Sequence, residues 1–156
     1  MTLTKTDYKN ALLKNGVVAF VPKGNSMWPF IKNGKNTVVV KTLTLPINAL
    51  DVILFERDNG DYVLHRVIKV EENSYITVGD NFPHPERIQK SQVLGVMDGF
   101  YTKEKYTQAT DEKYKKKVKK WYKNGLFIKA RKGFFALKIK TKTVIQRIFK
   151  RKKHNV

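Results

Sequence analysis

The sequence contains no cysteine among its 156 residues, which excludes disulfide bonds and cysteine-bound metal sites. It also contains no apolar run near the roughly 18–20 residues that a membrane-spanning helix needs. Residues 1–14 lack the apolar centre of a signal peptide. We therefore expect neither a signal peptide nor a transmembrane helix, and we expect a cytoplasmic location that leaves open peripheral attachment to the inner face of the membrane.

Several motifs of ligand-binding enzymes are also missing. The sequence has no glycine-rich phosphate-binding loop, no His-Glu-x-x-His pair and no carboxylate cluster with the spacing of metal ligands. It therefore predicts no metal site and no cofactor.

Acidic residues are scarce in the last third of the chain. Residues 103–156 contain 20 Lys and Arg but 3 Asp and Glu, whereas residues 1–102 contain 12 and 10. The net charges are therefore +17 and +2. This contrast predicts a near-neutral globular domain over 1–102 and a basic tail over 103–156. A tail of this kind usually binds an anionic surface of lipid or nucleic acid; the alternative is that its helices pack on the β-domain with their lysines in solvent.

The pattern of residues in the first part predicts mainly β structure. Short runs rich in β-branched and aromatic residues are separated by turn-forming residues. The expected strands span 17–21, 37–43, 51–57, 61–70, 75–78 and 93–97, after a short helix over 4–14. Segment 82–86, which contains two prolines, is expected to be irregular. The tail is expected to be helical over 113–123 and 126–149, with an apolar face on the second helix, so the whole chain is α+β.

Residues Gly24 to Phe30 form a turn after the first expected strand. The segment reads Gly-Asn-Ser-Met-Trp-Pro-Phe, and its proline biases the preceding tryptophan towards an extended conformation. Ser26 therefore lies where a strand ends, at a position that can hold a hydroxyl at the edge of a cleft. Taken alone, the stretch is equally compatible with a Gly-Asn turn that carries an incidental serine.

Two later segments supply partners for this serine. Tyr-Val-Leu-His-Arg-Val-Ile, at 62–68, places His65 inside a strand, and Val-Gly-Asp-Asn, at 78–81, places Asp80 at the end of another. A neutral histidine can take the proton of a serine hydroxyl near neutral pH, and a carboxylate can orient that histidine. The three residues Ser26, His65 and Asp80 are therefore the predicted catalytic set. The sequence leaves open whether Asp80 orients His65 directly or holds the site together.

The three boxes, in this order and at these spacings, resemble the superfamily of type I signal peptidases and self-cleaving LexA-type repressors. The His-Arg-Val-Ile and Gly-Asp-Asn boxes are most similar to signal peptidases of archaea, the endoplasmic reticulum and some sporulating bacteria, which use histidine where most bacterial enzymes use lysine. The resemblance covers about residues 18–99. It implies a coiled, mostly antiparallel β fold with the active site along one edge, and substrates with small residues before the cut.

The residues around the serine are expected to bind the substrate. The backbone N–H of Ser26 can stabilise an oxyanion. Many bacterial signal peptidases add a serine hydroxyl two positions before the nucleophile, but Gly24 occupies that position here. Asn25 can donate if its side chain turns inward. The resemblance implies that Met27 lines the cleft or packs beneath it, and Trp28 is expected to form core and cleft wall.

These features favour a serine endopeptidase that cleaves an extended peptide or precursor protein of the signal or leader type. Self-cleavage of the repressor kind is not expected, because the sequence contains no Ala-Gly pair. The alternative from another class is a non-catalytic binding module whose basic tail binds nucleic acid or a membrane. A nucleic-acid partner is the weaker expectation, since no recognised nucleic-acid-binding motif is present.

Overall fold

The computed structural model describes residues 5–43, 46–82 and 84–123. The chain divides into two compact units, Met1–Lys120 and Trp121–Val156. The division falls inside the last described helix, so the second unit is described only over that helix's final residues. The fold below is that of the first unit. The predicted helix over 126–149 lies outside the described residues.

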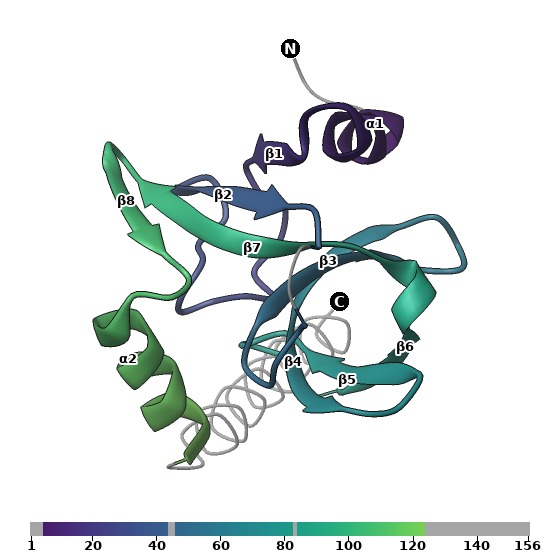
Figure 1. The fold of residues 1–156 in the computed structure, drawn as a ribbon. Coiled ribbons are helices and arrows are strands. Elements are labelled where there is room, and N and C mark those ends of the chain that lie inside the picture. Colours follow the sequence, from purple (N-terminus) through teal and green to yellow (C-terminus); the bar gives the residue numbers. More distant parts are fainter. Residues whose placement is uncertain (1–4, 44–45, 83, 124–156) are drawn as a thin grey trace, which may run out of the picture. The chain divides into compact units, whose positions relative to one another are not determined.

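The elements of the described chain are two α-helices, eight strands and one 3₁₀ turn (Figure 1). They follow in the order α1 (Lys5–Asn15), β1 (Val17–Phe20), β2 (Asn36–Lys41), β3 (Val52–Glu56), β4 (Tyr62–Val70), β5 (Ser74–Val78), β6 (Glu86–Gln89), η1 (Lys90–Gln92), β7 (Val93–Thr102), β8 (Lys105–Gln108) and α2 (Glu112–Lys123). Within these ranges no helix has both the length and the apolar character needed to cross a membrane.

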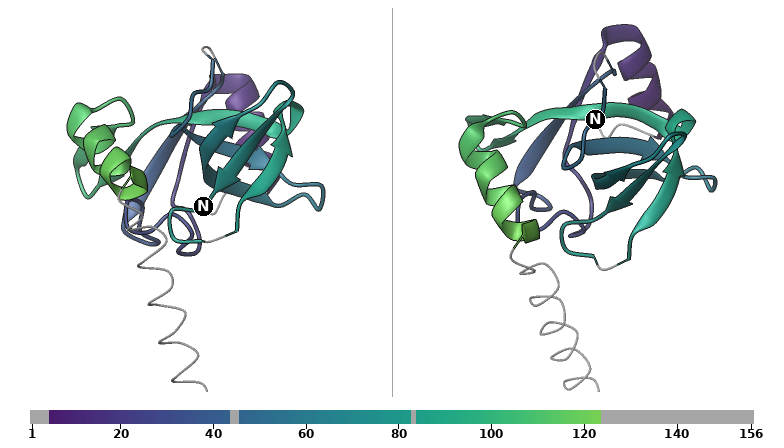
Figure 2. Two further views of the ribbon diagram at one scale, coloured as in Figure 1. Left: turned by 90° about the horizontal axis from the view of Figure 1, so that it is seen from below. Right: turned by 60° about the horizontal axis from the view of Figure 1, so that its bottom comes forward.

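The strands form one antiparallel sheet in the order β1-β2-β7-β3-β4-β5-β6, with β8 also paired to β7. The long strand β7 joins the two halves, because its residues from Val96 onward pair with β2 and its residues up to Val96 pair with β3. Figures 1 and 2 show β7 running between the β2 and β8 side and the β3 to β6 side.

Shifts in strand register bend this sheet. They occur in β2 between Val39 and Val40, in β3 between Leu54 and Phe55, and in β4 after Val67. An extra residue on one strand of an antiparallel pair increases the local twist, so the sheet coils. Buried side chains from several strands then meet in one core cluster, which consists of Ile47, Ile53, Phe55, Val67, Tyr75 and Ile88.

The predicted mainly β architecture is confirmed. Each expected strand corresponds to an observed strand, and apart from the end of β7 their bounds agree within two residues. Strand β7 is longer than expected, because it continues to Thr102 as the partner of β2 and β8. Two strands were not predicted. These are β8 and β6, and β6 begins at Glu86 inside the segment expected to be irregular. The predicted helices over 4–14 and 113–123 correspond to α1 and α2.

Candidate functional site

The serine turn, residues 24–31, connects β1 to β2 and is held by its own backbone. The Trp28 N–H donates to the Asn25 carbonyl at 3.2 Å, and the Ile31 N–H donates to the Met27 carbonyl at 2.9 Å. Met27 is buried with 3% exposure. Ser26 lies inside the loop that the first of these bonds closes and is partly exposed, so the fold presents its side chain at the surface of a fixed turn.

Gly79 shows how close the serine and the histidine lie. A methyl group built on Gly79 would be 3.1 Å from Ser26 Cβ, 3.1 Å from His65 Nε2 and 2.8 Å from the Ser26 carbonyl oxygen. Two atoms at the same distance from one point are separated by at most twice that distance. Ser26 Cβ and His65 Nε2 are therefore no more than 6.2 Å apart, and both border the space that a larger residue at position 79 would fill.

No hydrogen bond joins Ser26 Oγ to His65 Nε2 in the described part of the chain. Hydrogen bonds between catalytic groups are often long until a substrate binds. The arrangement brings the predicted nucleophile and base close together without a direct hydrogen bond.

Asn81 fixes the serine turn against the end of β5. Its backbone N–H donates to the Ser26 carbonyl at 2.7 Å, and its side-chain amide donates to the Asn25 carbonyl at 3.2 Å. The Ser26 N–H itself donates to no described backbone carbonyl and remains available to an oxyanion. In the Gly-Asp-Asn box, Gly79 thus leaves room for the site and Asn81 holds the serine in register with it.

His65 is a buried residue of β4, with 7% exposure. Its Nδ1 lies 2.9 Å from Glu86 Oε1, at the first residue of β6. The carboxylate lies off the line of an Nδ1–H bond, since no partner meets hydrogen-bond geometry at that atom. The contact is therefore chiefly electrostatic.

Glu86 is held in turn by Arg57. The Arg57 Nε and Nη2 atoms donate to the two carboxylate oxygens, both at 2.9 Å. A paired guanidinium and carboxylate of this kind fixes the orientation of the carboxylate as well as its charge. The hydrogen bonds from Arg57 therefore place Glu86 at the ring nitrogen of His65 that faces away from Ser26.

Burial lowers the pKa of His65 from its ordinary value of 6.5, and the nearby charge of Arg57 lowers it further, whereas Glu86 opposes the shift. Desolvation disfavours the charged imidazolium. A lowered pKa leaves His65 neutral at and below neutral pH, which is the state in which Nε2 can accept a proton. The electrostatics of the site therefore suit a general base.

Asp80 contacts Arg66. The Arg66 Nε and Nη2 atoms donate to the two Asp80 oxygens, both at 2.7 Å, and the side chains are 1% and 0% exposed. Arg66 also donates to the Leu50 carbonyl at 2.8 Å and to the Tyr114 hydroxyl at 3.1 Å. Of the two roles left open by the sequence, these contacts correspond to the one in which Asp80 holds the site together.

A cleft of about 730 Å³ surrounds the serine and histidine. Of the residues expected to bind substrate, Gly24, Asn25 and Met27 line it, while Trp28 does not and is 44% exposed. The cleft is also lined by residues of α1, β1, the first half of β4 and the segment before β6; these include Tyr8, Phe20, Tyr62, Phe82, His84 and Glu86.

The first half of β4 offers an open strand edge in this cleft. β4 pairs with β3 over Tyr62–Arg66, but its pairing with β5 begins only at Arg66. Among the described strands, residues 63–65 therefore pair with a neighbouring strand on one side. An exposed edge of this kind can accept an extended peptide as an added strand.

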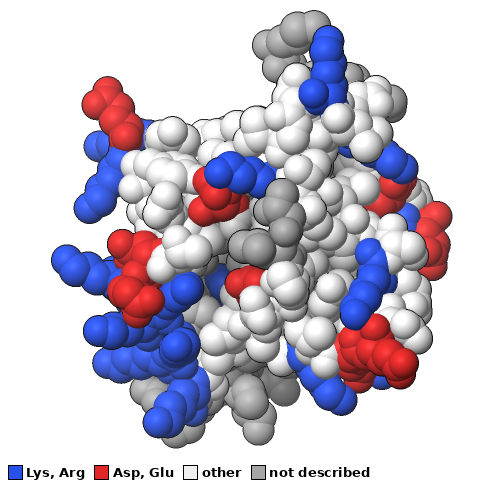
Figure 3. Space-filling view, viewed as in Figure 1, with Lys and Arg blue, Asp and Glu red and all other residues white. Residues whose placement is uncertain are grey.

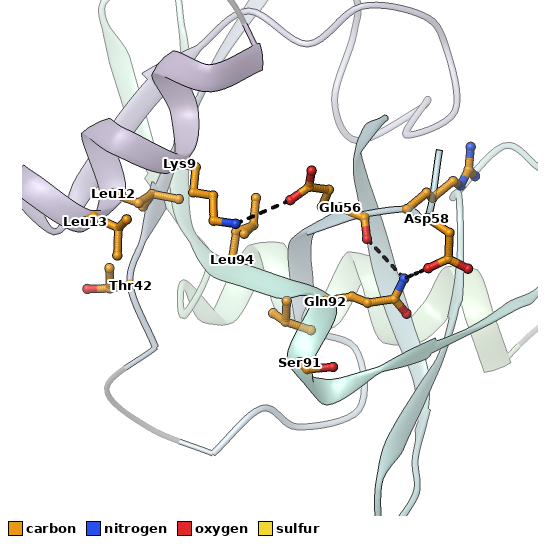
Figure 4. Close-up of a pocket in the computed structure, with 11 residues that line it drawn as sticks. Lys9, Leu12, Leu13, Thr42, Glu56, Asp58, Ser91, Gln92 and Leu94 are labelled. Carbon is orange, nitrogen blue, oxygen red and sulfur yellow. Dashed lines mark hydrogen bonds and ion pairs between the residues drawn. The ribbon is translucent and has the colours of Figure 1, made fainter. Parts of the chain in front are cut away.

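Another pocket lies between α1, the end of β3 and the start of β7, and has a volume of about 450 Å³ (Figure 4). There Lys9 Nζ lies 3.7 Å from Glu56, and the Gln92 amide donates to the Glu56 carbonyl and to Asp58. No histidine lines this pocket. It therefore lacks the pair of groups found in the cleft.

Glu86 is the site residue that the sequence did not indicate. It lies in a segment read as irregular because of its prolines, and a lone glutamate there carries no motif. The pairing of β5 with β6 is what places it, since Thr77 lies opposite Glu86. Only the recognition of residues 86–89 as a strand could have pointed to Glu86 from the sequence.

No protein-family model matches the chain, and no curated protein sequence matches it. The interpretation of the site therefore depends on its residues and geometry, together with the resemblance of the three boxes.

Proposed function

We propose that the protein is a serine endopeptidase with Ser26 as nucleophile and His65 as general base. The observation that carries the proposal is the closeness of Ser26 Cβ and His65 Nε2, which both lie 3.1 Å from the position that a methyl group on Gly79 would take. The lowered pKa of His65 and the free Ser26 N–H support it. We also propose that the coiled sheet is the catalytic fold of the superfamily that the boxes resemble.

In the proposed reaction, His65 Nε2 takes the hydroxyl proton as Ser26 Oγ attacks the carbonyl carbon of the scissile bond. The negative charge moves to the carbonyl oxygen, where the Ser26 N–H stabilises it. The C–N bond then breaks, and His65 gives the proton to the departing amine. Water, deprotonated by His65, hydrolyses the acyl ester and regenerates the serine.

Glu86 supplies the third role in this proposal. Its carboxylate lies at Nδ1, opposite the nitrogen that faces Ser26, and can stabilise the imidazolium that forms during attack. Asp80 has both oxygens bonded to Arg66, so it acts as a support for the turn that carries Gly79 and Asn81.

The cleft favours an extended peptide as substrate, bound along the open edge of β4. An aromatic wall borders this edge, since the ring of Tyr8 lies 4.9 Å from Phe20 and 6.0 Å from Tyr62 between centroids. Tyr62 precedes His65 by three positions, about 10 Å along a strand. An apolar substrate side chain about three residues from the scissile bond would therefore contact the wall.

The test uses a fluorogenic Ala-x-Ala peptide and a phosphonate reagent specific for activated serines. We expect wild type to cleave the peptide and to be labelled at Ser26, and Ser26→Ala to do neither. Ser91→Ala is the matched control, because Ser91 is exposed and lines the pocket that lacks a histidine. Turnover by purified Ser26→Ala at the wild-type rate would disprove the proposed nucleophile.

The proposal includes a place of action at the inner face of the cytoplasmic membrane, through the basic tail. Residues 103–156 carry a net charge of +17, and a cation near an anionic leaflet contributes on the order of 1 kcal/mol. Residues 124–156 lie outside the described part of the chain. Sedimentation with anionic vesicles, weakened by salt, tests this part, and a protein that stays in the supernatant at low salt refutes it.

A further inference from the structure

A third hollow, the lysine pocket, lies between β8, the first turns of α2 and the end of the serine turn. Its volume is about 840 Å³. Three cations line it, namely Lys105, Lys113 and Lys117, together with the polar side chains of Thr107 and Gln108. Its apolar lining comes from Pro29, Phe30, Phe100 and the rings of Tyr106 and Tyr114. None of these residues lines the Ser26–His65 cleft.

In the described part of the chain, none of the three lysines lies within ion-pair distance of an acidic side chain. Lys113 and Lys117 are one helical turn apart, where like charges repel. Asp111 also lines the pocket and caps α2, because its Oδ1 accepts the Tyr114 N–H at 2.8 Å. With three lysines and one aspartate, the lining of the pocket has an excess of positive charge.

The residues around the lysine pocket add to its positive electrostatic potential. Residues 103–120 contain eight lysines and three acidic residues, a net charge of +5, and Figure 3 shows basic side chains gathered over α2. A hollow lined by one sign of charge concentrates counter-ions more than a convex surface does.

The apolar wall of the pocket is fixed. The Tyr114 ring lies 5.9 Å from Phe30 and 5.5 Å from Phe100, and its hydroxyl accepts a hydrogen bond from the buried Arg66. A ligand would therefore meet a formed surface. Three lysines exceed what a single carboxylate can balance, whereas a phosphate carries a charge of about −1.5 to −2 and three acceptor oxygens.

We propose that the lysine pocket binds a phosphate-bearing ligand, with Lys105, Lys113 and Lys117 around the phosphate and the aromatic wall against the ligand's remaining part. The phosphate can belong to a soluble metabolite or to a phospholipid headgroup. This site is separate from the peptidase cleft, and its test does not depend on peptidase activity.

The experiment compares two double variants of the full chain that lose the same charge. Lys113→Ala with Lys117→Ala removes two lysines from the pocket, and Lys116→Ala with Lys119→Ala removes two exposed lysines of α2 that do not line it. Alanine keeps the helix propensity. Binding of inorganic pyrophosphate is measured by calorimetry at fixed ionic strength, and binding to phosphatidylcholine vesicles containing phosphatidylglycerol is measured by sedimentation.

We expect the pocket variant to bind at least about tenfold more weakly than wild type, and the control variant to stay within about twofold. Selective loss with pyrophosphate indicates a soluble phosphate ligand, and selective loss with vesicles alone indicates a headgroup. Equal losses in the two variants would mean diffuse charge and would overturn the proposal. Failure of wild type to bind either probe would also overturn it.

Discussion

Replacing Asp80 by asparagine is expected to lower the stability of the fold far more than a surface substitution would. Asparagine has nearly the shape of aspartate but no charge. Arg66, at 1% exposure, would keep its bonds to Leu50 and Tyr114 but lose the anion that both Nε and Nη2 contact at 2.7 Å. The variant therefore removes the carboxylate charge that two nitrogens of this buried cation contact.

The size of the effect follows from burial. Removing one partner of a buried ion pair costs about 3–5 kcal/mol, whereas an exposed pair contributes about 0–1 kcal/mol. The domain's total stability is expected to be about 5–15 kcal/mol. For a unit of this size each kcal/mol shifts the melting temperature by roughly 3–5 °C, so Asp80→Asn should lower it by roughly 10–25 °C.

Thermal and urea unfolding followed by circular dichroism measure this change. Glu56→Gln is the matched control, since it removes the charge of a partly exposed pair with Lys9 and should cost less than about 1 kcal/mol. Adding Arg66→Met to Asp80→Asn removes the stranded cation and should restore part of the loss. A melting temperature for Asp80→Asn within a few degrees of wild type would refute the assignment of Asp80 as a buried structural partner.

Three further outcomes concern catalysis. In the pH profile of kcat/KM, the midpoint of the acid limb should lie below pH 6.5, because burial lowers the pKa of His65 and the neutral form is the proposed base. A midpoint above pH 7 would contradict this. Glu86→Gln should reduce kcat/KM roughly 10–100-fold. It should also move the acid limb to lower pH, since Glu86 raises the pKa of His65. An unchanged limb would argue against an interaction between Glu86 and His65. Gly79→Ala should reduce kcat on the order of 100-fold, because its methyl would lie 2.8 Å from the Ser26 carbonyl; wild-type turnover would show that the site tolerates that methyl.

Local sequence patterns were sufficient to predict most of the sheet. β3 and β4 each combine a run of β-branched and aromatic residues with a strong turn, Asp-Asn-Gly-Asp at 58–61, between them. Such signals depend on neighbours in sequence. The position of His65 within a strand could therefore be inferred before any long-range contact was known, whereas Ser26 lies in a turn beyond the end of β1 at Phe20.

The features that the sequence did not predict, namely β6, β8 and the role of Glu86, depend on contacts between distant segments. β6 has four residues after two prolines, and it is a strand because β5 lies beside it. β8 follows β7 directly and pairs back on it over Gly99–Thr102. A short edge strand has too few residues to show a clear alternation of apolar and polar side chains. Whether such a segment forms a strand therefore depends on the strand beside it. Glu86 went unrecognised for this reason, although it supplies the carboxylate nearest His65.

The alternation of side chains along β4 explains why Glu86, and not Asp80, contacts His65. Successive side chains of a strand point to opposite faces of the sheet, so His65 and Arg66 cannot share one carboxylate from the same side. Asp80 is bound through both oxygens to Arg66, which commits it to the Arg66 face. His65 must then find its carboxylate on the other face, and β6 brings Glu86 to that position. In this fold the adjacent residues His65 and Arg66 of β4 therefore contact two separate carboxylates, Glu86 at His65 and Asp80 at Arg66.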